Sequence, residues 1–171
     1  MHEPWAVAAL LCVPYRPFAG ASAKNDTVLA ACARHPERFL VPGFDTPEVA
    51  VARTLTDPDN AVWEVWRGGT FLGILVLDRI VRGIDARLQF VFFDDDLASK
   101  AELLREFTRR CFAEAGLHRL TFEAPDYMDT LLNFARKQLG FRYEGGARAG
   151  SRRERAYFDG ERWSDVIVLR V

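Results

Sequence analysis

Three apolar-rich stretches in the middle of the chain have the length and pattern of β-strands. Ala61–Trp66 and Thr70–Leu77 flank Gly68-Gly69, and a glycine pair between two such stretches favours a tight turn. We therefore expect these two stretches to form a hairpin. Arg87–Phe93 alternates at every second position, with Leu88, Phe90 and Phe92 on one side, and predicts the next strand.

The apolar spacing then changes to that of an α-helix. A first stripe predicts a helix that ends at Gly116. Its apolar members are Leu97, Ala101, Leu104, Thr108, Cys111 and Ala115, and its solvent-facing members are Lys100, Glu102, Arg105, Glu106, Arg109 and Arg110. A second helix is predicted over Met128–Leu139, with a strand at Arg119–Ala124 between the two helices. Phe141–Glu144 and Trp163–Val171 predict two further strands.

Seven prolines divide residues 1–60 into short pieces. Trp5–Val13 predicts a buried strand, and Lys24–Arg34 predicts a helix. Thr46-Pro47-Glu48 predicts the start of a second helix, because Thr can cap a helix, Pro fits its first turn and Glu suits its positive end. We expect this helix to end before Pro58.

The predicted order is strand, two helices, three strands, helix, strand, helix and two strands. This order predicts an α/β (α+β) fold, in which helices pack on the faces of one central sheet. The length of 171 residues suits one domain. We expect residues 1–171 to form a single domain, with an N-terminal strand and two helices in residues 1–60 and the core sheet in residues 61–171.

Charge and cysteine content exclude several classes of function. The chain has 23 basic and 24 acidic side chains, so its net charge of -1 provides no overall field to attract nucleic acid or an anionic membrane. The apolar run Trp5–Val13 is too short to cross a bilayer, and no basic start marks a signal peptide, so we expect a cytoplasmic protein. Cys12, Cys32 and Cys111 have no zinc-like spacing, so we expect buried, inert thiols and no metal site.

Three short runs resemble the GNAT superfamily of N-acetyltransferases, and among its branches the ribosomal-protein and small-amine acetyltransferases are the most similar. The runs are Gly116–Leu120, Leu139–Gly145 and Asp159–Asp165. The resemblance implies a GNAT-like domain whose mixed central sheet has helices on both faces. It also implies that Gln89–Phe93 and Arg119–Ala124 are adjacent parallel strands, joined by the first predicted helix.

Members of that superfamily bind acetyl-CoA where two central parallel strands separate, and the coenzyme's pyrophosphate accepts hydrogen bonds from backbone N–H groups at the start of the next helix. By resemblance, the residues that would contact acetyl-CoA here are Val91, Phe92, Phe93, Ala98 and Ser99. The usual loop reads Arg/Gln-x-x-Gly-x-Gly/Ala, and its glycines let the backbone approach the phosphates. Here Asp94–Ser99 stands in its place, with three acids and no glycine.

These acids predict a degenerate coenzyme site, because negative charges repel a pyrophosphate. The same acids can cap the helix and complement its dipole, and we expect both effects. Arg136 stands where many members have a tyrosine that protonates the departing thiolate, and an arginine cannot give up a proton near neutral pH. The carboxylates available as a general base are Glu123, at the end of its strand, and Asp85.

One segment of the chain is densely basic. Its arginines are Arg148, Arg152, Arg153 and Arg155. A guanidinium cluster of this kind binds a phosphate, an RNA backbone or an acidic partner surface, and it is also compatible with a solvated turn between two strands. The net charge of -1 counts against RNA, so we expect an acidic protein partner or self-association.

Two functions follow from these observations. The first is a non-catalytic GNAT-like interaction or assembly module without a cofactor, for example in a bacteriophage particle, where small domains of this type occur; its location would then be the virion. The second is an active N-acetyltransferase that uses acetyl-CoA and a primary amine. The missing glycines and the missing general acid favour the first function.

Overall fold

The computed structural model describes residues 3–16, 28, 30–32, 34–35, 47–94, 96–158 and 163–171. The strands are β1 (Trp5–Val7), β2 (Leu10–Pro14), β3 (Ala61–Arg67), β4 (Thr70–Val81), β5 (Asp85–Phe92), β6 (Arg119–Pro125), β7 (Arg142–Tyr143), β8 (Arg152–Phe158) and β9 (Trp163–Arg170). The helices are α2 (Pro47–Thr56), α3 (Ala101–Ala113) and α4 (Asp129–Leu139), with short 3-10 turns at Ala98–Lys100 and Ala149–Ser151.

The strands form one mixed sheet, as the sequence predicts. Their order is β1-β2-β3-β4-β5-β6-β9-β7, and β8 pairs with another part of β9. Every pair is antiparallel except β5 and β6, which are parallel. The prediction that these two strands are adjacent and parallel, with a helix between them in the chain, is confirmed.

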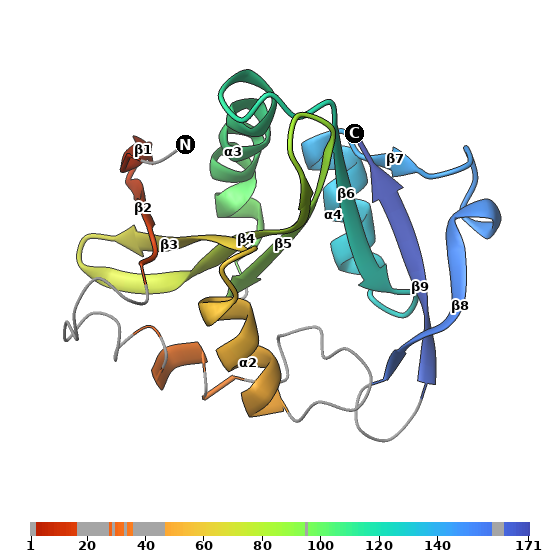
Figure 1. Ribbon diagram of the computed structural model, residues 1–171, viewed down its shortest axis with the longest axis horizontal. Helices are drawn as coiled ribbons and strands as arrows, with labels where there is room; N and C mark the ends of the chain where they lie inside the picture. Colours follow the sequence, from red (N-terminus) through yellow and green to blue (C-terminus); the bar gives the residue numbers. More distant parts are fainter. Residues whose placement is uncertain are drawn as a thin grey trace.

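Helices cover both faces of this sheet, which confirms the predicted fold class. The first apolar cluster packs α3 and α4 against one face, and its members include Leu88, Leu103, Leu104, Phe107, Leu120, Phe122, Leu132 and Ala135. The second packs α2 and the helical residues near Cys32 against the other face, and its members are Val28, Cys32, Val51, Leu55, Val62, Ile74, Val76 and Val91. Figure 1 shows α2 below the β3–β4–β5 part of the sheet and α3 and α4 on its other side.

Two N-terminal predictions have different outcomes. The predicted helix start at Thr46-Pro47-Glu48 is confirmed, because α2 begins at Pro47 and ends at Thr56, before Pro58. The single strand predicted over Trp5–Val13 is wrong. It is a hairpin of β1 and β2 that turns at Ala8, whose φ of 51° is unusual for a residue with a side chain. The predicted helix over Lys24–Arg34 is described at Val28 and residues 30–32, which are helical, and at Arg34, which is in a turn.

Two further predictions need correction. The arginine-rich segment is not a simple turn, because its second half forms strand β8, paired with β9. Lys100 does not face solvent, since its side chain is fully buried. The hairpin of β3 and β4 around Gly68-Gly69 is confirmed, and so are the strands and helices predicted between Arg87 and Leu139, with shifts of a few residues at their ends.

Candidate functional site

The two parallel strands separate halfway along their length, as the resemblance implies. Their pairing runs from Asp85 and Arg119 to Leu88 and Phe122, where it ends. Beyond this point β5 remains paired with β4 and β6 with β9. Glu123 is therefore the first residue of β6 past the separation.

Three phenylalanines pack together on the helix side of this separation. Phe90 of β5 stacks on Phe122 of β6, with ring centroids 5.3 Å apart, and meets Phe134 of α4 edge to face at 6.4 Å. Aromatic pairs at these distances attract each other beyond the area that they bury. The contacts join β5, β6 and α4 across the place where the two strands separate.

The loop between β5 and α3 is organised around the buried ammonium of Lys100. Its Nζ donates to Asp94 Oδ1 at 2.6 Å and Oδ2 at 2.8 Å, to the Asp96 carbonyl at 2.9 Å and to Ser99 Oγ at 3.0 Å. The ammonium also lies 5.6 Å from the centre of the Phe92 ring. Since Lys100 is the N-cap residue of α3, a cation bound to an aspartate lies at the start of this helix.

Asp96 caps the 3-10 turn that precedes α3. Its Oδ1 accepts a hydrogen bond of 3.2 Å from the backbone N–H of Ser99, and its carbonyl accepts one of 3.0 Å from the Ser99 hydroxyl. The bonds from Ser99 lower the pKa of the exposed Asp96 carboxyl below its ordinary value, so it is ionised at neutral pH. Asp96, one residue before the turn's N-cap residue Leu97, thus accepts a capping-type bond, whereas Asp95 lies outside the described residues.

The residues that the resemblance assigns to a coenzyme fall into two groups. Val91 is buried in the second apolar cluster, and Phe93 packs on Phe71 with ring centroids 5.6 Å apart. Phe92, Ala98 and Ser99 lie at the loop, where Ala98 and Ser99 are exposed. The loop therefore brings Phe92 and Ser99 close to Lys100. From the sequence, we assigned Lys100 only to the solvent-facing side of the helix. Its spacing from Leu97 and Leu104 places it in the apolar stripe and could have indicated burial.

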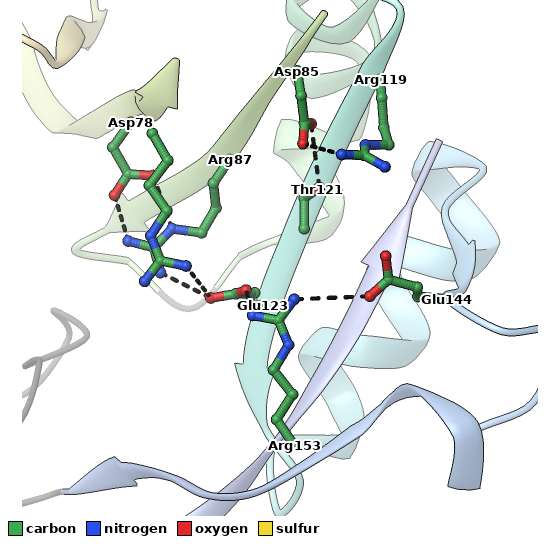
Figure 2. A network of polar contacts seen from close by, with 9 residues as sticks. Asp78, Asp85, Arg87, Arg119, Thr121, Glu123, Glu144 and Arg153 are labelled. Atoms are coloured by element: carbon green, nitrogen blue, oxygen red, sulfur yellow. Dashed lines mark hydrogen bonds and ion pairs between the residues drawn. The ribbon is translucent and has the colours of Figure 1, made fainter. Parts of the chain in front are cut away.

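Figure 2 shows a polar network on the sheet face opposite α3 and α4, with Arg87 at its centre. Arg87 donates Nε to Asp78 Oδ1 at 2.8 Å and Nη1 to Glu123 Oε2 at 2.9 Å, and it also contacts Asp78 Oδ2. Burial opposes the charge of Arg87, but its bonds to Asp78 and then to Glu123 outweigh burial, so the pKa of the guanidinium is raised. Gln89 completes the network with a bond of 2.5 Å to Asp78.

Glu123, the predicted general base, is surrounded by arginines. Its side chain is 9% exposed, and Arg153 donates to Oε1 at 2.8 Å while Arg87 donates to Oε2. Arg79 approaches Oε2 at 3.6 Å. Both carboxylate oxygens already accept hydrogen bonds from N–H groups. A proton added to either oxygen would therefore point at another hydrogen-bond donor. Catalysis by Glu123 would require one of these guanidinium groups to move away.

Asp85, the second carboxylate considered as a base, is bound in the same way. Its Oδ2 accepts a bond of 2.6 Å from Arg119, and this contact raises the pKa of the arginine. Thr121 lies beside them (Figure 2), and its hydroxyl is 3.3 Å from Asp85 Oδ1. A cavity of about 120 Å³ lies within the network, and it is lined by Arg79, Asp85, Arg87, Arg119, Thr121, Glu123, Glu144 and Arg153.

Arg136, in the last turn of α4, contacts β7. Its guanidinium lies 4.3 Å from the centre of the Tyr143 ring and donates to the Tyr143 hydroxyl at 3.2 Å. Phe134 of α4 meets Phe90 of β5. That Arg136 occupies the position of the family's general acid stays a prediction.

The arginines proposed as an interface are held by acids of the same chain. Arg148 donates to Asp129 at 2.7 Å and to the Asp126 carbonyl, while Arg152 pairs with Asp165. Arg153, half exposed, joins Glu123 to Glu144, at 2.8 and 3.8 Å. The backbone of Arg155 belongs to β8, and its side chain lies outside the described residues.

The three cysteines are buried, and no disulfide joins them. Burial raises the pKa of each thiol from 9.0 to about 12, although Arg110 partly opposes this at Cys12. Within the described ranges, no group of three or more His, Cys, Asp or Glu side chains could hold a metal ion. In the same part of the chain, no helix is long and apolar enough to span a membrane.

No protein-family model matches the sequence, and no curated protein sequence is significantly similar to it. Solved structures are similar in fold. A probable acetyltransferase of the GNAT family from Chromobacterium violaceum superposes with a TM-score of 0.72 at 20% identity, covering 100% of this chain and 91% of that one. The spermidine N-acetyltransferase of Vibrio cholerae, in complex with CoA and spermine, gives 0.69 at 13% identity, with 95% of each chain covered.

A dodecameric structure of the same Vibrio cholerae enzyme gives a TM-score of 0.68 at 14% identity and covers 95% of this chain and 93% of that one. These likenesses extend over nearly the whole chain. The protein therefore has the GNAT fold.

Proposed function

We propose that this GNAT-fold protein is a pseudoenzyme, a non-catalytic interaction or assembly module whose coenzyme loop is filled by its own side chains. The observation that carries the proposal is the Lys100 ammonium, buried at the start of α3 and bound by both oxygens of Asp94. A helix start attracts a pyrophosphate through free N–H groups and positive charge. Here Asp96 already accepts the Ser99 N–H, and Asp94 neutralises the only cation buried in the described part of the loop.

The network at the strand separation supports the same proposal. A general base must accept a proton from an amine, and Glu123 already accepts bonds from Arg87 and Arg153. Phe90, Phe122 and Phe134 pack across the separation on the helix side. Ion pairs and aromatic contacts thus hold together the region that would have to admit a substrate. A bacteriophage particle is one assembly in which such a module would serve.

A second candidate is an N-acetyltransferase that uses acetyl-CoA and a primary amine. The separation of β5 and β6 favours it, as does the similarity to an enzyme solved with CoA and spermine. Arg79, Arg87 and Arg153 already surround the carboxylate at that separation, so an acceptor amine would have to displace a guanidinium group to reach Glu123.

Calorimetry with acetyl-CoA separates the two candidates. We expect no measurable heat with the wild-type protein at about 100 µM coenzyme. A dissociation constant of about 10 µM or tighter, close to -7 kcal/mol, would overturn the non-catalytic proposal. The second candidate would then be tested by acetyl transfer to amines that differ in charge.

A triple variant tests whether the loop alone prevents binding. Asp95→Arg, Asp96→Gly and Ala98→Gly together remove two carboxylates, add a cation and let the backbone approach a phosphate. We expect acetyl-CoA to bind this variant more tightly than the wild type, at the cost of a lower melting temperature because the Asp96 cap is lost. Asp59→Gly with Glu154→Arg changes the net charge equally and serves as the control. If neither variant binds, Phe90→Ala in the triple background tests the aromatic contacts.

A further inference from the structure

A second hollow lies at the end of the sheet away from the strand separation. It is found where β6 begins, β9 ends and α4 meets β7, and its volume is about 1150 Å³. Figure 1 shows these segments together near the C-terminus, whereas β5 and β6 separate towards the other end of β6. The hollow is therefore distinct from the place where the GNAT fold binds its coenzyme.

The side chains around this hollow are strongly basic. Its lining includes Arg119, Arg136, Lys137, Arg142 and Arg170 together with His118, and no lining residue has an acidic side chain. Asp85 pairs with Arg119, and Arg136 donates to Tyr143. Lys137, Arg142 and Arg170 are exposed, and their side chains make no hydrogen bond or ion pair with the described residues. Three cationic groups are thus available to a ligand.

The register of β7 and β9 places two of these cations directly opposite each other. Arg142 and Arg170 are Cα partners in the antiparallel pair, so both side chains project from the same face of the sheet. Like charges opposite each other destabilise a strand pair. Basic residues suit the last turn of a helix, which explains why Arg136 and Lys137 stand at the end of α4. The same reason does not explain Arg142 and Arg170, because they lie on strands.

We propose that this hollow binds a compact ligand that carries several phosphate groups. One guanidinium group can bind two phosphate oxygens at once through parallel N–H bonds. The lining has four arginines, which come from β6, α4, β7 and β9. A bound polyanion removes the repulsion between Arg142 and Arg170. A phosphate chain provides more charge in a short length than the carboxylates of a peptide do, so it matches this density of cations better. The inference is independent of the function proposed for the coenzyme loop.

The test is calorimetry with inorganic tripolyphosphate at low and moderate salt. We expect binding to the wild type that weakens as salt rises. Arg142→Gln with Arg170→Gln should weaken binding by about tenfold or more, close to 1.4 kcal/mol. The same variant should melt no lower than the wild type without ligand, because the repulsion is removed. The control, Arg34→Gln with Arg82→Gln, removes two exposed charges that do not line the hollow and should bind as the wild type does.

Three outcomes would overturn the proposal. Equal binding by the Arg142/Arg170 variant and the control variant would mean that the general charge of the protein attracts the probe. Orthophosphate binding as tightly as tripolyphosphate would mean that a single anion suffices and that no polyanion site exists. Tighter binding of a polyglutamate peptide than of tripolyphosphate would assign the hollow to an acidic segment of a protein.

Discussion

At the scale of single residues, Lys100 determines how the loop before α3 is built. Its ammonium has three N–H donors and four oxygens within 3.0 Å, so a fully buried cation loses little by leaving water. The Asp94 side chain is 38% exposed and keeps part of its hydration. The two partners are thus unequal, and removing either one has a different cost.

This inequality predicts the outcome of a double-mutant cycle. Asp94→Asn leaves the buried ammonium without its counter-ion and should lower the free energy of unfolding by about 2–4 kcal/mol. Lys100→Met leaves an aspartate that water can reach and keeps an apolar chain against Phe92, so it should cost about 1 kcal/mol. Urea unfolding measures both. In the double variant the costs should not add, and strictly additive costs would mean that Asp94 and Lys100 do not interact.

At the scale of elements, β8 places arginines beside carboxylates that come from other strands. We propose that Arg148, Arg152, Arg153 and Arg155 contact an acidic partner surface, including that of another copy of the chain. Replacing all four with Ser should reduce salt-sensitive self-association, measured by sedimentation velocity at two salt concentrations. The melting temperature should also fall, because Glu123 loses Arg153 and Asp165 loses Arg152.

The stability loss must be separated from the loss of an interface. Arg148→Ser alone breaks only exposed contacts, so it should change association more than melting. Arg82→Ser is the control, since Arg82 is exposed and lies outside this segment. If the four-Ser variant sediments as the wild type does at both salt concentrations, the arginines serve the internal ion pairs alone.

The same elements show which features the sequence could predict. The apolar stretches that flank Gly68-Gly69 and the helical stripes after residue 96 depend on local sequence, and the structure has these elements where predicted. The turn at Ala8 was missed because it contains no Gly, Pro or Asn. Strand β8 was missed because its charged residues resemble a loop, and the acids that neutralise Arg153 come from β6 and from the residue after β7.

The candidate site was less predictable than the fold. The acidic loop is visible in the sequence, and so is the cap that Asp96 provides. The role of Lys100 depends on burial, and we expected solvent exposure because of its charge, although its spacing follows the apolar stripe. The pairing of Arg87 with Asp78 and Glu123 joins three strands, and only the sheet register brings such residues together.

At the scale of the whole molecule, the two apolar clusters lie on opposite faces of one sheet. Cys12 and Cys111 belong to the first cluster and Cys32 to the second, and all three side chains are fully buried. The thiols therefore report on both faces. We propose that residues 1–171 fold as one cooperative domain, in which neither face opens without the other.

Labelling each cysteine with iodoacetamide, followed by peptide mass analysis, tests this proposal. With a pKa of about 12 in place of 9.0, each folded thiol has about one thousandth of the thiolate of a free one near pH 8, so labelling requires opening. Because each thiol has a higher pKa in the folded protein than in the unfolded chain, protonated thiols favour the folded state. This contribution to the free energy of unfolding is complete below pH 9 and is lost as the pH rises towards 12. All three rates should be equal and should match global unfolding. Faster labelling of Cys32 alone would show that the second face opens separately and would contradict a single cooperative domain.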